Sequence, residues 1–265
     1  MRYIDIHSHV NDARFDDDRD AVLERMRAED IATIAVGTDR AMSEKAVALA
    51  DVHSDIWATI GLHPTDNTRE DLDDAAYAKL AAHPRVVAIG ECGLDYHWPA
   101  HDGWPGGEEE EKQRQHDVFT RQIAVAERAG KPLMIHGRPT PRTMDAYEDI
   151  LAILAEHPAV VGDVHFFVGD EAIAKRFLDR GFTLSFTGVL TFTHDYDAVV
   201  KFAPLDRIHA ETDAPYVAPI PFRGKRNEPV YVLETIRAIA RIRGEDLDRV
   251  AAALVENAKR LFHLS

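Results

Sequence analysis

The chain has 265 residues, and its content of 45% hydrophobic and 29% charged residues is ordinary for a soluble globular protein. Its 46 acidic and 31 basic residues give a net charge of −15, which repels polyanions at long range and argues against a protein that coats nucleic acid, although not against an enzyme with a local basic patch. No apolar run approaches the ~20 residues that cross a bilayer, no signal peptide precedes the first strand, and the single cysteine, Cys92, excludes an intrachain disulfide. These features predict a cytoplasmic protein without a membrane partner.

Apolar strands and amphipathic helices alternate along the chain. The predicted strands cover residues 2–9, 31–37, 56–61, 86–90, 132–135, 160–164, 182–186 and 208–212. The predicted helices cover residues 19–29, 43–53 (with Ser43 as a candidate cap), 72–82, 108–129, 146–156, 171–180, 196–202, 230–243 and 245–261. Eight strands in a chain near the ~250 residues of a closed barrel predict an α/β fold, a (β/α)₈ TIM barrel. Because no linker or repeat is present, we expect a single domain over residues 1–265.

The first strand ends in two histidines, His7 and His9. Side chains alternate along a strand with a period of two, so both rings point the same way. Neutral imidazole is the commonest protein ligand for transition metals, so the pair forms half of a metal site. An isolated pair of this kind is equally compatible with two surface histidines, and the interpretation depends on ligands from elsewhere in the chain.

Other strands supply such ligands at the same place. In a TIM barrel the reactive groups come from the C-terminal ends of several strands. The strand exits carry six metal-type side chains, which are His7, His9, Glu91, His136, His165 and Asp213. Their co-location predicts a metal site. His63 also follows a strand, where we expect it to contact substrate rather than metal, with a structural role in the turn left open.

The order of the local motifs resembles that of the TatD family of metal-dependent hydrolases. The matching stretches are residues 7–9 (HSH), 90–95 (GECGLD), 135–138 (IHGR), 165–169 (HFFVG), 211–216 (ETDAPY) and 223–229 (RGKRNEP). The resemblance spans residues 1 to about 262 and implies a TIM barrel with two divalent ions and a hydrolytic activity. Many members are magnesium-dependent deoxyribonucleases, commonly acting 3′→5′, which implies single-stranded or damaged DNA as substrate. It also implies that one ion is held by His7, His9, Glu91 and Asp213, and the other by Glu91, His136 and His165.

The chain departs from the family pattern at positions that border the mouth. Phe166 and Val168 stand where the family usually has Cys and Ser. The segments 97–107 and 138–143 are longer than usual. The ligand positions are retained, so these departures put the substrate preference in doubt rather than the site.

Two cations about 3.5–4 Å apart bind a phosphodiester oxygen, activate a water and stabilise the leaving oxygen. Glu91 is the expected bridging carboxylate, and Asp213 is expected to accept the proton of the attacking water, a role worth ~10²–10⁴ in rate. Imidazole-rich ligation suits Zn²⁺ or Mn²⁺ better than Mg²⁺, and the choice among the three for turnover stays open.

Basic residues near the site predict an anionic substrate. Arg223, Lys225 and Arg226 form the densest basic cluster, and Arg138 follows His136 by two residues. Guanidinium groups pair bidentately with phosphate, although a solvated surface loop explains the cluster as well. Aromatic residues that suit base stacking, with loop packing as the alternative, are Tyr96, Trp98, Trp104 and Tyr216.

Two other classes of function remain open on the sequence alone. A metal-dependent amidohydrolase, esterase or lactonase acting on a small molecule is chemically reasonable, although no lysine stands at the exit of the fourth or fifth strand to be carbamylated. A non-catalytic scaffold stabilised by metal is disfavoured by the complete set of ligands. The oligomeric state is open, with a monomer favoured.

Overall fold

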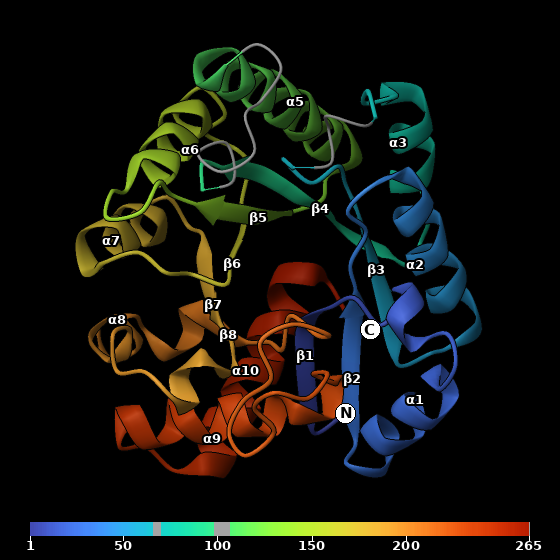
Figure 1. Ribbon diagram of the computed structural model, residues 1–265, viewed down its shortest axis with the longest axis vertical. Coiled ribbons are helices and arrows are strands. Elements are labelled where there is room, and N and C mark those ends of the chain that lie inside the picture. The colour runs from blue at the N-terminus through green and yellow to red at the C-terminus, as the bar shows by residue number, and fades with distance from the viewer. Residues whose placement is uncertain (66–69, 98–106, 265) are drawn as a thin grey trace.

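The computed structural model describes residues 1–65, 70–97 and 107–264, and Figure 1 shows strands arranged around a centre with helices outside them. The strands are parallel and follow one another around the sheet in chain order. A parallel bridge between Ser8 and Ala214 brings the segment after the last strand against the first. The strands are β1 Tyr3–Ser8, β2 Ile31–Ala35, β3 Ile56–Ile60, β4 Val86–Asp95, β5 Leu133–Arg138, β6 Gly162–His165, β7 Thr183–Phe186 and β8 Ile208–Ala210. The predicted single-domain TIM barrel is therefore confirmed.

The helices that precede β8 connect consecutive strands and cover the outer face of the barrel, and two further helices follow β8 (Figure 1). Their apolar stripes pack on the strands in one continuous core, to which Leu23 of α1, Phe119 of α5 and Ile150 of α6 contribute. The helices are α1 Arg19–Ala28, α2 Arg40–Val52, α3 Asp74–Ala81, α5 Glu108–Ala129, α6 Asp145–Ala155, α7 Glu171–Asp179, α8 Asp197–Phe202, α9 Val232–Arg243 and α10 Leu247–Phe262.

A second buried cluster fills the barrel interior. It joins Ile4, Ile34 and Met134, from β1, β2 and β5, to Phe262 at the end of α10. The outer helices α1 to α9 contribute no residue to this cluster, so its strand residues face inward.

Several predicted boundaries were wrong, among them the start of the second helix and the ends of β4 and β8. The second helix begins at Arg40, where Asp39 is the cap and accepts a hydrogen bond from the amide of Met42 at 2.6 Å, so Ser43 lies inside the helix. Strand β4 continues five residues beyond Gly90, because its pairing with β5 resumes after an irregularity between Ile89 and Cys92. Strand β8 ends at Ala210, before Glu211 and Thr212.

The long loop predicted over residues 97–107 lies largely outside the described residues. Within the described part of the chain, no helix combines the length and the apolar character needed to span a membrane.

Candidate metal centre

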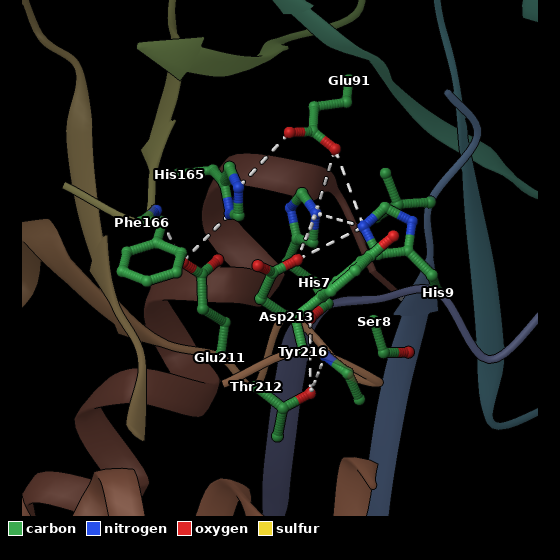
Figure 2. A network of polar contacts seen from close by, with 12 residues as sticks. His7, Ser8, His9, Glu91, His165, Phe166, Glu211, Thr212, Asp213 and Tyr216 are labelled. Carbon is green, nitrogen blue, oxygen red and sulfur yellow. Dashed lines mark hydrogen bonds and ion pairs between the residues drawn. The ribbon is translucent and has the colours of Figure 1, made fainter. Parts of the chain in front are cut away.

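The two histidines of the first strand converge at the mouth of the barrel, as their spacing predicts (Figure 2). The Nε2 atoms of His7 and His9 lie 3.3 Å apart. Each also approaches the same two carboxylate oxygens. Glu91 Oε2 is 3.4 Å from His7 and 3.7 Å from His9, and Asp213 Oδ1 is 3.8 Å from His7 and 3.3 Å from His9. His7 belongs to β1 and His9 follows it directly, whereas Glu91 belongs to β4 and Asp213 follows β8, so the closed barrel brings these ligand atoms together.

These separations match the edges of a metal coordination shell. A tetrahedral ion with bonds of about 2.0–2.1 Å holds its ligand atoms roughly 3.3–3.4 Å apart. The five measured separations, from 3.3 to 3.8 Å, are close to that value. The donor set of imidazole nitrogens and carboxylate oxygens is also that of a transition-metal site. Without a shared cation, the facing nitrogens of His7 and His9 give each other at most one hydrogen bond.

The other oxygen of Glu91 faces a second set of imidazoles. Glu91 Oε1 lies 2.9 Å from His136 Nδ1, 3.4 Å from His165 Nε2 and 3.4 Å from His63 Nε2. Glu91 is only 3% exposed. One buried carboxylate therefore lies between two sets of potential ligands, each reached by a different oxygen atom.

Three groups of side chains place their ligand atoms close enough to share one ion. They are His7 with His9 and Glu91, His7 with His165 and Asp213, and His63 with Glu91 and His136. The grouping expected from the family resemblance put His165 with His136. In the structure the ring of His165 stacks on His7 at 3.6 Å between centroids and is 6.1 Å from that of His136.

The electrostatics of the cluster favour ionised carboxylates. Burial raises the pKa of Glu91, but the nearby rings of His63, His165 and His7 outweigh burial and hold that pKa well below its usual value. Burial also raises the pKa of Asp213, and its hydrogen bond with His9 together with the other rings lowers it overall. Both acids are therefore charged at neutral pH and available to a cation.

The histidines divide into two kinds. Burial and the neighbouring ring of His165 lower the pKa of His7, which keeps that imidazole neutral, as a ligand must be. Burial lowers the pKa of His9 and His165 as well, but carboxylates raise it overall, through Asp213 for His9 and through Glu211 and Glu91 for His165. A cation that binds here displaces protons from these two rings.

Two buried acids that the sequence reasoning missed orient the cluster histidines. Asp95 Oδ2 contacts His136 Nε2 at 3.0 Å, which turns Nδ1 toward Glu91. Glu211 Oε1 contacts His165 Nδ1 at 3.1 Å and accepts a hydrogen bond from the amide of Phe166 at 2.6 Å. Carboxylates behind ligating histidines fix the ring orientation and the tautomer. Had the fourth predicted strand been extended through Asp95, the sequence would have indicated this acid, because residues 91, 93 and 95 point to the same face of a strand.

Asp5 ties the first strand to the segment after β8. Its carboxylate accepts hydrogen bonds from the amides of His7 at 3.2 Å and Thr212 at 2.9 Å, and from the Thr212 hydroxyl at 2.5 Å. Asp213 follows at once with φ of 54°, a left-handed conformation that Asp tolerates better than most residues. This network sets where the Asp213 carboxylate meets His9.

The predicted substrate contacts occupy different environments. Arg226 forms a two-oxygen ion pair with Asp18 at 2.6 and 2.8 Å, so much of its hydrogen-bonding capacity is satisfied within the protein. Arg223 donates to the carbonyl oxygen of Ala218, and Lys225 is exposed. Arg138 ends β5 and pairs in register with Asp95, next to the second set of imidazoles.

The aromatic candidates for base stacking also differ. Tyr96 is buried, and its hydroxyl group contacts His116 and Asp149, which excludes it from stacking on a substrate. Trp98 and Trp104 lie outside the described residues. Tyr216 is exposed.

Comparison with known proteins identifies the family. The family described as TatD related DNase matches residues 4–263. The chain belongs to the TatD family. It is 40% identical over 267 residues to the metal-dependent hydrolase YabD of Bacillus subtilis, an alignment that covers 98% of this chain and 99% of the relative. The protein is therefore a metal-dependent hydrolase of the TatD family, as the motifs predicted.

Other TatD relatives carry a more specific name or a solved structure. A Cronobacter sakazakii protein named 3′-5′ ssDNA/RNA exonuclease TatD is 34% identical over 272 residues, with 97% of each chain covered. The crystal structure of the TatD homologue YjjV from Escherichia coli superposes with a TM-score of 0.85 at 26% identity, covering 100% of this chain and 99% of that one.

Proposed function

We propose that this TatD-family hydrolase cleaves phosphodiester bonds at the 3′ end of single-stranded nucleic acid, intact or damaged, using two divalent ions. The observation that carries the proposal is the position of Glu91, whose two oxygens face two separate sets of imidazoles. The name of the Cronobacter relative, a single-stranded DNA and RNA exonuclease, supports the choice of substrate.

The residues fit two ions that share Glu91. His7, His9 and Asp213 would hold one ion with Glu91 Oε2. His136 and His165 would hold the other with Glu91 Oε1. Such a pair activates a water and stabilises the phosphate charge. The histidine-rich donor set favours Mn²⁺ or Zn²⁺ for tight binding, with Mg²⁺ as the weaker oxygen-preferring alternative.

Asp213 is the proposed general base. Its carboxylate is ionised and only 14% exposed, and it lies 3.3 Å from His9 on the Oε2 side of Glu91. From this position it can accept a proton from a water that attacks the phosphorus atom. A general base in such a position is expected to increase the rate by a factor of ~10²–10⁴.

His63 is proposed to donate a hydrogen bond to the substrate rather than to complete the second set of ligands. Its Nδ1 atom lies 3.2 Å from the amide nitrogen of Thr65 and 2.8 Å from the Thr65 hydroxyl oxygen. Both contacts are satisfied when Nδ1 accepts, which leaves the proton on Nε2, the atom that faces Glu91 Oε1. An Nε2–H group directed into the mouth suits a phosphate oxygen on the side of Glu91 opposite Asp213.

The basic residues have unequal parts in this proposal. Arg138 lies at the end of β5 beside the second set of imidazoles and suits the substrate phosphate. Arg223 and Lys225 would add attraction at longer range, which offsets the net charge of −15 near the mouth. Arg226 would contribute least, because Asp18 already neutralises its charge.

A small-molecule esterase, lactonase or amidohydrolase is the alternative. A carbamylated-lysine bridge between two ions needs a lysine at the mouth. The nearest candidate by sequence, Lys131, precedes β5 at the opposite end of the strand and donates a hydrogen bond to the carbonyl of Val86. This placement favours a carboxylate bridge and the phosphodiesterase.

The test is metal analysis of the purified protein followed by a substrate panel. Single-stranded DNA, RNA, a lactone and a carboxylic ester are each incubated with Mg²⁺ and Mn²⁺. The proposal predicts progressive shortening of a 5′-labelled strand from its 3′ end and little turnover of the small esters. Turnover of the lactone or ester with an intact labelled strand would reverse the assignment.

A further inference from the structure

Tyr216 lies beside the candidate metal centre, next to His9 and Asp213 (Figure 2). The residue is 47% exposed. Its ring packs against that of His9, with centroids 6.0 Å apart and planes at 82°. The amide of Tyr216 donates a hydrogen bond to the carbonyl oxygen of Asp213 at 2.9 Å, so the ring projects from the same turn that carries the proposed base.

Arg14 fixes this exposed ring from one side. The guanidinium carbon lies 4.3 Å from the ring centroid, and Nη2 donates a hydrogen bond to the Tyr216 hydroxyl at 2.6 Å. Asp12 in turn accepts hydrogen bonds from Nε and Nη2 of Arg14 at 2.9 and 2.7 Å. Because Asp12 neutralises the guanidinium, we assign Arg14 to holding the ring rather than to binding phosphate.

The backbone behind the ring is fixed as well. Asn227 is fully buried and donates hydrogen bonds from Nδ2 to the carbonyl oxygens of Tyr216 at 2.7 Å and Thr212 at 2.8 Å. An aromatic ring that is held in place before a ligand arrives loses little conformational entropy on binding. The arrangement therefore suits a ligand that stacks on the ring.

We propose that Tyr216 is the stacking platform for the nucleobase of the 3′-terminal nucleotide, an assignment that rests on the proposed function. A phosphate held between Glu91 and Asp213 lies within the reach of one nucleotide from a ring that contacts His9. Arg14 occupies one face of the ring, and the base takes the other, which extends the cation–π contact into a three-layer stack. Every base has a π face, so the platform tolerates any sequence.

Phe192 provides a matched control. It is 41% exposed, and the guanidinium carbon of Arg223 lies 4.1 Å from its ring centroid, much as Arg14 covers Tyr216. It follows the short helix Gly188–Thr191 after β7, and its ring contacts no histidine of the cluster among the described residues. The two rings thus share exposure and a stacked guanidinium but differ in their distance from the cluster.

The test compares single strands that end in a normal 3′ nucleotide or in its abasic analogue. For the wild type, loss of one stacked base is expected to raise KM by roughly 5- to 150-fold. Tyr216→Ala should raise KM for the normal strand by a similar factor and abolish the difference between the two strands. Tyr216→Phe and Phe192→Ala should both keep the difference. If Tyr216→Phe loses it as fully as Tyr216→Ala, the hydroxyl contact with Arg14 is what matters, and the platform is wrong.

A binding measurement separates failure of the platform from failure of the proposed function. A strand with 2-aminopurine at its 3′ end is bound in Ca²⁺, and its fluorescence should be quenched by the wild type but not by Tyr216→Ala. Equal quenching by both proteins, or hydrolysis without any preference for the terminal base, overturns the platform alone. If the wild type neither binds nor cleaves any strand, the proposed function falls, and the platform falls with it.

Discussion

Glu211→Gln tests whether a buried acid behind the cluster prepares His165 to bind a metal. Oε1 of Glu211 is the partner of both His165 Nδ1 and the amide of Phe166. With the proton of His165 on Nδ1, the lone pair of Nε2 faces Glu91. Loss of the carboxylate charge weakens this bias and lowers the basicity of Nε2, even where the amide oxygen of Gln still accepts from Nδ1–H. Changes of this kind typically lower metal affinity 10–100-fold, which corresponds to about 1.4–2.7 kcal/mol.

The same substitution has a structural cost. Oε2 of Glu211 is buried and accepts no hydrogen bond from any residue that the structure describes. If the amide oxygen of Gln replaces Oε1, its NH₂ group takes the position of Oε2 without an acceptor. An unsatisfied buried donor costs about 1–3 kcal/mol, and because Oε2 is already unsatisfied in the wild type, the free energy of unfolding should fall by at most that amount.

Asp163→Asn is the matched control. Asp163 is also fully buried and lies two residues before His165, but its Oδ1 accepts a hydrogen bond from the Thr183 hydroxyl at 2.6 Å. Burial, and then the charge of Glu211, raise its pKa to about 7, so Asn removes only part of a charge at neutral pH. Zn²⁺ or Mn²⁺ affinity, measured by competition with a chromogenic chelator, should fall for Glu211→Gln and change only a few-fold for Asp163→Asn. Equal affinities for wild type and Glu211→Gln would refute the reasoning.

Three further outcomes are expected. Asp213→Asn should keep most of its metal and lose ~10²-fold or more in kcat; loss of metal that added Mn²⁺ partly restores would make Asp213 chiefly a ligand. Replacing Arg223, Lys225 and Arg226 together with Ala should weaken binding of single-stranded DNA and flatten its salt dependence, whereas Arg226→Ala alone should leave the salt slope nearly unchanged. Burial lowers the pKa of His136, but Asp95 and Glu91 raise it to about 9 overall. In protein freed of metal, the stability from this histidine is therefore present below its unfolded pKa of about 6.5 and is lost as the pH rises through about 9. Chemical denaturation at pH 6 and pH 9.5, compared with His136→Asn, measures this loss.

The barrel and the convergence of the cluster could be predicted from the sequence because both follow from strand periodicity. Several strands carry a metal-type side chain at or near their C-terminal end, and these ends meet at the mouth once parallel strands close, so His7, Glu91, His136 and Asp213 could be placed together without coordinates. The strands follow one another around the sheet in chain order. The order of these residues around the mouth is therefore their order in the sequence.

The supporting contacts could not be predicted, because they depend on local irregularities and on distant partners. Asp95 enters the site only because β4 continues past an irregularity between Ile89 and Cys92. The sequence placed Arg226 in the basic cluster, yet its ion pair with Asp18 joins residues 208 positions apart. Arg14, which holds the ring of Tyr216, is 202 positions away from it in the sequence. No local pattern in the sequence reports such pairings.

The central claim is that Glu91 bridges two ions in a phosphodiesterase. The most direct measurement is the equilibrium content of Mn²⁺ per chain, taken on the same preparations as the digestion of a 5′-labelled single strand, for wild type and Glu91→Gln. The account predicts two ions per chain and shortening from the 3′ end for the wild type, and at most one tightly bound ion with loss of digestion for the variant. A Glu91→Gln protein that keeps two ions and digests at the wild-type rate would contradict it.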